Sequence, residues 1–463
     1  MDNSTRNTGD LWGDRRRRGS MTHRIRRLVG GLGLIGLAGG GLVAIAPAAH
    51  AATATVTSTT DGAPGSLRAL ISASNAGGAH TIDIPPGTYD LTIAPTGGDD
   101  NSSGDLNITQ AATIVGTGGA SQTKIVVQMA DRAIMTQAHT TISGVTVTDG
   151  TAPSDEDGGD IYAPQGGDLT LTDSVLTNGT ALGGGGLGAQ SPLVAHNDTF
   201  SNNTAQAIPG NGSFGGGLLV TDNATIDSST FNGNRAPGGS GGGVELDDFG
   251  PSKVVTLTNS TVTANTADSG PGVASANGGP STLIYDTIAG NNGTNIGGGV
   301  LADSSGSNVT VTNTVLVGNT QGSTAANCVV QAGASIVSGG GNLSSDGTCA
   351  SEFNHAADAN SNTAAHLGAL ADNGGSTLTM LPGAGSSAID TAPCLSSVTL
   401  DQRGWGRPYG PGCDKGALEV QPAPGGSTTT TAPGGSTGST GPGGTDTTAS
   451  PAAAVNANAT FTG

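Results

Sequence analysis

The chain has 463 residues, of which 81 are glycine, 3% are aromatic and 11% are charged. So much glycine argues against a helical protein, and the regular spacing of the apolar residues argues against simple disorder. Residues 1–51 hold eight of the 16 basic residues and three of the 35 acidic ones, which leaves 8 basic against 32 acidic residues. The resulting net charge of about −24 disfavours partners such as nucleic acid and anionic membrane surfaces.

Residues 1–51 have the pattern of an export signal peptide. The basic stretch HRIRR (23–27) precedes an apolar run over roughly 28–46, and AHA (49–51) provides a small-x-small cleavage site. A membrane anchor is the alternative, but the apolar run is rich in glycine. We therefore predict a secreted or cell-surface protein with no membrane span after signal cleavage.

A strand, a turn and a short helix are predicted after the signal, in TATVTSTTDGAPGSLRALISASNA (53–76). The turn covers residues 61–65, and Leu67, Leu70 and Ile71 lie on one face of a helix over Ser66–Asn75. Such a helix would cover the open end of a stack of strands. We assign residues 52–130 to this cap and the first rungs of the stack.

A repeat of about 28 residues occupies residues 131–350. Seven copies, such as VTLTNSTVTANTA (255–267), align on one turn position, represented by Gly144, Asp173, Asn197, Ser228, Asn259, Tyr285 and Asn313. The residues two positions before and three positions after it are apolar in every copy. Mostly polar residues alternate with them, and this period of two is typical of β-strands with one buried face.

Glycine groups mark a third strand in the repeat, as in GGGL (215–218), GGGV (241–244) and GGGV (297–300). Three short strands cannot bury their own faces, but stacked coils enclose one continuous apolar core. Parallel strands prefer right-handed crossovers. The sequence therefore predicts an all-β protein, a right-handed parallel β-helix with a short N-terminal cap helix.

An asparagine recurs six positions after the aligned turn residue, at Asn203, Asn234, Asn265, Asn291 and Asn319. Asparagine tolerates left-handed backbone angles and can bond its neighbours above and below. A ligand-binding row is the alternative. We interpret these residues as a structural ladder.

Four cysteines, Cys328, Cys349, Cys394 and Cys413, indicate two disulfides in an exported chain. Three pairings are possible. The pairing of sequence neighbours would close two loops of about 20 residues, each contributing roughly 3 kcal/mol. Metal ligation is disfavoured because there is no CxxC spacing and no nearby pair of histidines.

Three stretches resemble known bacterial sequences. The pairing of GGG[LV] with FSNN (200–203) and FNGN (231–234) resembles the repeats of polymorphic outer-membrane proteins, and DGAPGSLRALISASNA (61–76) resembles the N-terminal segment of CSLREA-type secreted proteins. Residues 351–420, with AID, DQRG and CDKGALE, are similar to a choice-of-anchor module, although Lys415 and Leu418 depart from its usual pattern. The resemblance implies an exported β-helix with the pectin-lyase-like fold, but it does not imply a catalytic activity, because a fold does not carry a function. Residues 421–463 are predicted to be a disordered Pro/Gly/Ser/Thr stalk.

Two groups of side chains are candidates for chemistry. Weak catalytic candidates are Arg235 with Glu245, Asp247 and Asp248, because a lyase of this fold needs a basic residue and carboxylates. A possible calcium site comprises Asp155, Glu156, Asp157 and Asp160, because hard cations need several oxygens at once. Glu245, Asp247 and Asp248 could contribute oxygens in the same way, with Asp222 and Asp303 at comparable positions on the adjoining rungs. A solvated acidic loop is the alternative that we favour for the second group.

We predict a monomeric interaction protein of adhesin type that contacts envelope or environmental polysaccharide through its outer Thr, Ser and Asn residues. No cofactor is required, and calcium is possible. The alternatives are a polysaccharide lyase or glycoside hydrolase, and a purely structural envelope spacer.

Overall fold

The computed structural model describes residues 52–78, 80–97, 100–208, 211–247, 252–277 and 279–421, which lie in one compact unit. The predicted signal peptide, Asp248 and all but the first residue of the predicted stalk lie outside the described residues. Within the described ranges, no helix is long and apolar enough to span a bilayer.

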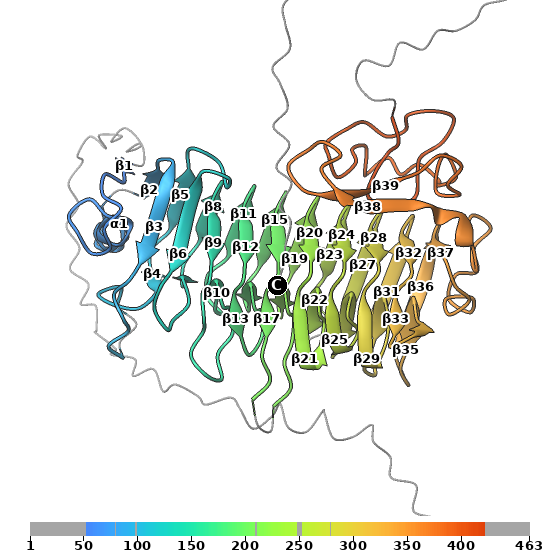
Figure 1. The fold of residues 1–463 in the computed structure, drawn as a ribbon, viewed down its shortest axis with the longest axis horizontal. Coiled ribbons are helices and arrows are strands. Elements are labelled where there is room, and N and C mark those ends of the chain that lie inside the picture. The colour runs from blue at the N-terminus through green and yellow to red at the C-terminus, as the bar shows by residue number, and fades with distance from the viewer. Residues whose placement is uncertain are drawn as a thin grey trace, which may run out of the picture. The chain divides into compact units, whose positions relative to one another are not determined.

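Parallel strands stack into the long β-helix of Figure 1. The central repeats contribute strands to four sheets, which we number 1 to 4 in the order in which the chain passes through them within one such repeat. Sheet 1 contains β1 (Thr53–Thr55), β2 (Thr81–Ile84), β5 (Ala112–Gly116), β8 (Thr140–Ser143), β11 (Leu169–Thr172), β15 (Leu193–His196), β19 (Ala224–Asp227), β23 (Val255–Thr258), β27 (Pro280–Ile284), β31 (Asn308–Thr312) and β36 (Ser335–Gly340). Sheet 2 contains β3 (Gly87–Leu91), β6 (Thr123–Val127), β9 (Thr146–Thr148), β12 (Val175–Thr177), β16 (Thr199–Ser201), β20 (Thr230–Asn232), β24 (Thr261–Thr263), β28 (Thr287–Ala289), β32 (Val315–Val317) and β37 (Leu343–Ser344).

The glycine groups precede strands of sheet 4, as predicted. This sheet contains β4 (Leu106–Ile108), β7 (Ile134–Thr136), β10 (Ile161–Ala163), β14 (Leu187–Ala189), β18 (Leu218–Val220), β22 (Val244–Asp247), β26 (Val273–Ala276), β30 (Val300–Ala302) and β35 (Cys328–Val330). The predicted parallel β-helix is confirmed.

A fourth sheet was not predicted. Sheet 3 lies between sheets 2 and 4 along the chain and contains β13 (Thr180–Ala181), β17 (Thr204–Ala205), β21 (Arg235–Ser240), β25 (Thr266–Ser269), β29 (Asn292–Ile296), β33 (Thr320–Gln321) and β34 (Thr324–Ala325). Some of its strands are only two residues long, too short to show a period in the sequence. The prediction of three strands per repeat is therefore wrong for the central repeats.

The core follows the aligned columns. Leu171 pairs with Ala195 in sheet 1, and Phe200 pairs with Phe231 in sheet 2, where the two rings stack with centroids 4.7 Å apart. The turn between sheets 1 and 2 has a positive φ at every aligned residue, for example 48° at Asn259. Left-handed backbone is tolerated best by Gly and Asn, which explains their frequency in this column.

The asparagine row is a buried ladder, as predicted. Each amide Nδ2 donates to Oδ1 of the asparagine on the next rung at 2.8–3.1 Å, and Asn327 ends the row. The same Nδ2 atoms donate to backbone carbonyls of the apolar column in sheet 2, such as the Phe231 carbonyl, 3.0 Å from Asn265 Nδ2. Left-handed backbone occurs one residue before the ladder, for example at Asn202, and not in the ladder itself.

A second buried ladder follows the aligned turn residues. The backbone N–H of each member donates to the side chain of the next at 2.8–3.2 Å, through Ser174, Asp198, Ser229, Ser260, Asp286, Thr314 and Asn342. Burial raises the pKa of both aspartates well above the ordinary value, and backbone hydrogen bonds only partly oppose it. One carboxyl oxygen of each aspartate is buried without a hydrogen-bond partner.

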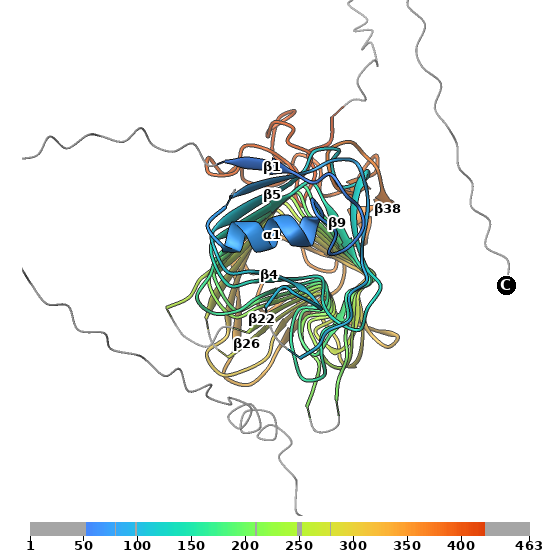
Figure 2. The ribbon, with the colours of Figure 1, turned by 90° about the vertical axis from the view of Figure 1, so that its left-hand side faces the viewer.

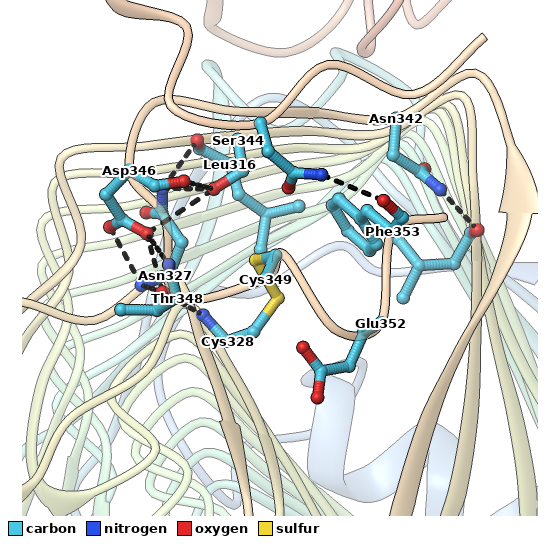
Figure 3. Close-up of a disulfide and its surroundings, with 12 residues drawn as sticks. Leu316, Asn327, Cys328, Asn342, Ser344, Asp346, Thr348, Cys349, Glu352 and Phe353 are labelled. Carbon is cyan, nitrogen blue, oxygen red and sulfur yellow. Dashed lines mark hydrogen bonds between the residues drawn. A yellow bond between two sulfur atoms is a disulfide. The ribbon is translucent and has the colours of Figure 1, made fainter. Parts of the chain in front are cut away.

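Both ends of the β-helix are covered. Helix α1 (Leu67–Asn75) covers the N-terminal end in Figure 2, with Leu67 and Ile71 buried and the Ser66 hydroxyl capping its first turn. At the other end, Phe353 fills the core and the Cys328–Cys349 disulfide ties strand β35 to the closing segment, as Figure 3 shows. The second disulfide joins Cys394 to Cys413, so the pairing of sequence neighbours is confirmed.

Candidate ligand-binding face

Alternate residues of sheet 1 point outward and stack in register from β8 to β31. We call this surface the hydroxyl face. Its first column is Thr141, Thr170, Val194, Thr225, Thr256, Thr282 and Thr310, and its second is Ser143, Thr172, His196, Asp227, Thr258, Ile284 and Thr312. Every member is at least partly exposed. Neighbouring strands lie about 4.8 Å apart and residues i and i+2 about 6.7 Å apart, so the hydroxyls form a regular two-dimensional array.

The hydroxyl groups of this face have no hydrogen-bond partner within the described part of the chain. None of its Ser or Thr side chains makes a hydrogen bond with a described residue. In sheet 2, by contrast, Thr146 Oγ1 donates to the Ala120 carbonyl at 2.7 Å, and Thr177 Oγ1 donates to the Ser201 carbonyl at 2.9 Å. The hydroxyls of sheet 1 are therefore available to a ligand.

The C-terminal segment (residues 366–421) covers part of the outer face of sheet 2. It includes the hairpin of β38 (Leu367–Ala371) and β39 (Thr379–Pro382), and it lies beside the β-helix in Figures 1 and 2. Gln402 contacts two successive rungs, because its Oε1 accepts from Thr261 Oγ1 at 2.6 Å and its Nε2 donates to Thr230 Oγ1 at 2.9 Å. One side chain of the C-terminal segment thus bonds the outward hydroxyls of two successive rungs.

The motif residues of this segment form a buried polar cluster. Arg407 pairs with Glu419 at 3.1 Å, with both side chains 0% exposed, and its guanidinium lies 4.3 Å from the Tyr285 ring centroid. Asp401 pairs with Arg403 at 2.7 Å and accepts from the Glu419 N–H. The DQRG and CDKGALE residues hold the segment against the β-helix.

The centre of the hydroxyl face carries a His–Asp pair. His196 and Asp227 are partners in register on β15 and β19, and His196 Nδ1 lies 2.9 Å from Asp227 Oδ2. The hydrogen bond that His196 donates to the Asp227 carboxylate raises the pKa of His196, and burial only partly opposes it. This pair was not predicted from the sequence, although its members immediately precede the aligned turn residues Asn197 and Ser228 of consecutive repeats.

The catalytic candidates lie on different sheets. Arg235 is exposed on β21 of sheet 3, in register with Thr204 and Thr266. Glu245 and Asp247 are both buried on β22 of sheet 4, where Asp247 Oδ1 accepts from Asn277 Nδ2 at 2.5 Å. A catalytic role for these residues stays a prediction.

The four acidic residues of the predicted calcium loop have different surroundings. Asp155 is exposed, Glu156 pairs with Arg132, and Asp157 accepts from Gln190 at 2.8 Å. Asp160 is fully buried and accepts from the Gly150 N–H at 3.1 Å. Burial raises the pKa of Asp157 to about 6 and that of Asp160 well above its ordinary value.

The other two acidic candidates also lie apart. Asp222 pairs with Lys253 at 2.8 Å, and Asp303 directly follows β30. Among the described residues, no group of three or more His, Cys, Asp or Glu could hold a metal ion. Calcium binding therefore stays a prediction, and the described acidic residues do not gather into a group that could hold the ion.

Comparison with known proteins identifies the fold. Residues 133–316 match the family model described as a right handed beta helix region. The chain folds as a right-handed parallel β-helix. No curated protein matches it.

Among solved structures, the β-helix is similar to pectate lyase Pel9A, with 18% identity, a TM-score of 0.41, and coverage of 80% of this chain and 95% of that chain. It is also similar to the A-module of the Azotobacter vinelandii mannuronan C-5 epimerase AlgE4, with 16% identity, a TM-score of 0.27, and coverage of 60% and 88%.

Proposed function

We propose that this β-helix is an exported interaction protein that binds a neutral polysaccharide along its hydroxyl face, without cleaving it. The observation that carries the proposal is the array of outward Ser and Thr hydroxyls in sheet 1 that no described residue satisfies. A polysaccharide offers hydroxyls at regular intervals, so successive rungs can each contribute one hydrogen bond. The two disulfides and the predicted signal peptide support export.

Charge favours a neutral ligand. The only charged side chains on the hydroxyl face are those of Asp227 and, when protonated, His196, and the mature chain carries a net charge of about −24. A polyanion would be repelled by this field, whereas a neutral sugar polymer would not. The resemblance of the repeats and the C-terminal segment to surface-associated families supports a location at the cell envelope.

The test compares the purified full chain with two matched triple variants. The first, Thr170→Val, Thr256→Val and Thr310→Val, removes three hydroxyls from the face without changing side-chain shape. The control, Thr180→Val, Thr204→Val and Thr266→Val, removes three outward hydroxyls from sheet 3. Retention and chain cleavage are measured on insoluble neutral glucans, xylan and galactan, and on polygalacturonate with and without calcium.

We expect retention on a neutral polymer without cleavage. At about 1 kcal/mol per hydrogen bond, the face variant loses roughly 3 kcal/mol, or about a hundredfold in affinity. The sheet 3 control should bind as the wild type does. Cleavage of any polymer would favour the lyase or hydrolase alternative, and absence of binding would favour a structural spacer. Equal binding by both variants would place the site elsewhere.

A further inference from the structure

The His–Asp pair interrupts the hydroxyl face with a fixed polar group. Asp227 Oδ2 accepts from His196 Nδ1 at 2.9 Å and from Ser228 Oγ at 3.0 Å, while Asn259 Nδ2 donates to Oδ1 at 3.4 Å. These donors hold the carboxylate in place, yet 32% of the Asp227 side chain and 46% of the His196 side chain remain exposed. A preorganised and exposed pair loses little entropy when it binds a ligand.

The imidazole has a free end. Its Nδ1 is taken up by Asp227, and Nε2 has no hydrogen-bond partner among the described residues. The charged groups facing His196 are Asp227 on β19, Asp173 in the turn after β11 and Asp198 beneath its own turn. All are carboxyls, and they favour the imidazolium form, in which Nε2 is a hydrogen-bond donor.

The apolar and hydroxyl neighbours complete a patch of four residues, Val194, His196, Thr225 and Asp227. Val194 and Thr225 are partners in register, two residues before His196 and Asp227 respectively, and Val194 is 46% exposed. Sugar rings present C–H groups next to hydroxyls. An exposed valine beside a donor and an acceptor matches that pattern.

We propose that this patch is a monosaccharide subsite that fixes the register of the polysaccharide on the face. Asp227 Oδ1 accepts a hydrogen bond from one hydroxyl of a neutral sugar unit, and His196 Nε2–H donates to the oxygen of the adjacent hydroxyl. The C–H face of the ring packs on Val194. The subsite rests on the proposed function, since it is one position of the same polymer site.

Anionic sugars do not fit this patch. A uronate carboxylate would approach the carboxyls of Asp227 and Asp173, while the charge of protonated His196 is already paired with Asp227. A carboxylate brought close to like charges is repelled. The subsite therefore selects neutral hexoses or pentoses with vicinal hydroxyls.

The test uses the neutral polymer retained by the full-chain wild type, and short oligosaccharides cut from it, between pH 5 and pH 8. The variants are Asp227→Asn and His196→Gln. The control is His139→Gln, which removes the imidazole of the exposed His139–Asp168 pair, 2.8 Å apart and just outside the columns. Thermal unfolding of each variant checks that it is folded.

We expect each subsite variant to weaken oligosaccharide binding about tenfold, because each loses a hydrogen bond to a charged group. Wild-type affinity should fall as pH rises through the raised pKa of His196, and His196→Gln should abolish that dependence. His139→Gln should match the wild type. Subsite variants that bind within twofold of wild type at every pH would overturn the subsite. If the sheet 1 triple variant nevertheless loses binding, the proposed function stands without the subsite. No wild-type binding to any neutral polymer would overturn both.

Discussion

Replacing one asparagine of the buried ladder tests what holds the rungs together. Asn265 is fully buried and makes four side-chain hydrogen bonds: Nδ2 donates to the Phe231 carbonyl at 3.0 Å and to Asn291 Oδ1 at 2.9 Å, while Oδ1 accepts from the Asn234 N–H at 2.8 Å and from Asn234 Nδ2 at 3.0 Å. Asn265→Ala removes all four. It leaves the Asn234 donors and the Phe231 carbonyl buried without these partners.

The expected loss follows from this count. A net hydrogen bond contributes about 1 kcal/mol, and each group left buried and unsatisfied costs about 1–3 kcal/mol. The free energy of unfolding should therefore fall by about 4–6 kcal/mol, a large part of the 5–15 kcal/mol that is usual for a domain. Guanidinium unfolding followed by circular dichroism measures the change as a lower midpoint.

The control is Asn232→Ala on β20, because this asparagine points outward and its side chain makes no hydrogen bond with a described residue. We expect a change within about 0.5 kcal/mol. A loss below about 2 kcal/mol in Asn265→Ala would show that the ladder adds little to stability and that the apolar columns alone hold the rungs.

Three further predictions concern the interior and the C-terminal half. Asp286→Asn should stabilise the protein at neutral pH, because burial raises the pKa of the Asp286 carboxyl in the folded state. The stability that Asp286 contributes is therefore full below its ordinary pKa of about 3.9 and is lost as pH rises through the folded-state pKa. Urea unfolding from pH 4 to pH 7 should show the wild type losing stability relative to the variant, and parallel curves would contradict the raised pKa. The double variant Cys328→Ser and Cys349→Ser should lose about 3 kcal/mol, since the loop spans 21 residues, and an unchanged denaturation midpoint would show that the core around Phe353 closes this end unaided. Glu419→Gln should cost about 3–5 kcal/mol by leaving the Arg407 charge buried and unpaired, and limited proteolysis should then cut within residues 366–421; resistance equal to that of wild type would show that the hydroxyl contacts hold the segment without this pair.

The sequence alone determined the stacking of this protein. Three local patterns repeat because successive rungs meet similar neighbours: period-two apolar columns, an aligned turn position that favours left-handed residues, and glycine groups before several strands of sheet 4. The asparagine ladder was predictable for the same reason, and the cap helix was predictable from the apolar face formed by Leu67, Leu70 and Ile71. The two-residue strands of sheet 3 carry too few residues for a pattern, so only the structure revealed them.

Only the tertiary structure decided which outer face of the β-helix is left uncovered by the C-terminal segment. Thr256-Leu-Thr258 in sheet 1 and Thr261-Val-Thr263 in sheet 2 are nearly identical strands in adjacent positions of one repeat. Yet Thr261 is fully buried under Gln402, which lies 141 residues further along the chain, while Thr256 and Thr258 remain partly exposed. The alternation of apolar and polar residues along a strand indicates only that a polar side chain points away from the core. Whether that outer face meets solvent or a distant segment depends on long-range packing, and no local pattern in the strand encodes it.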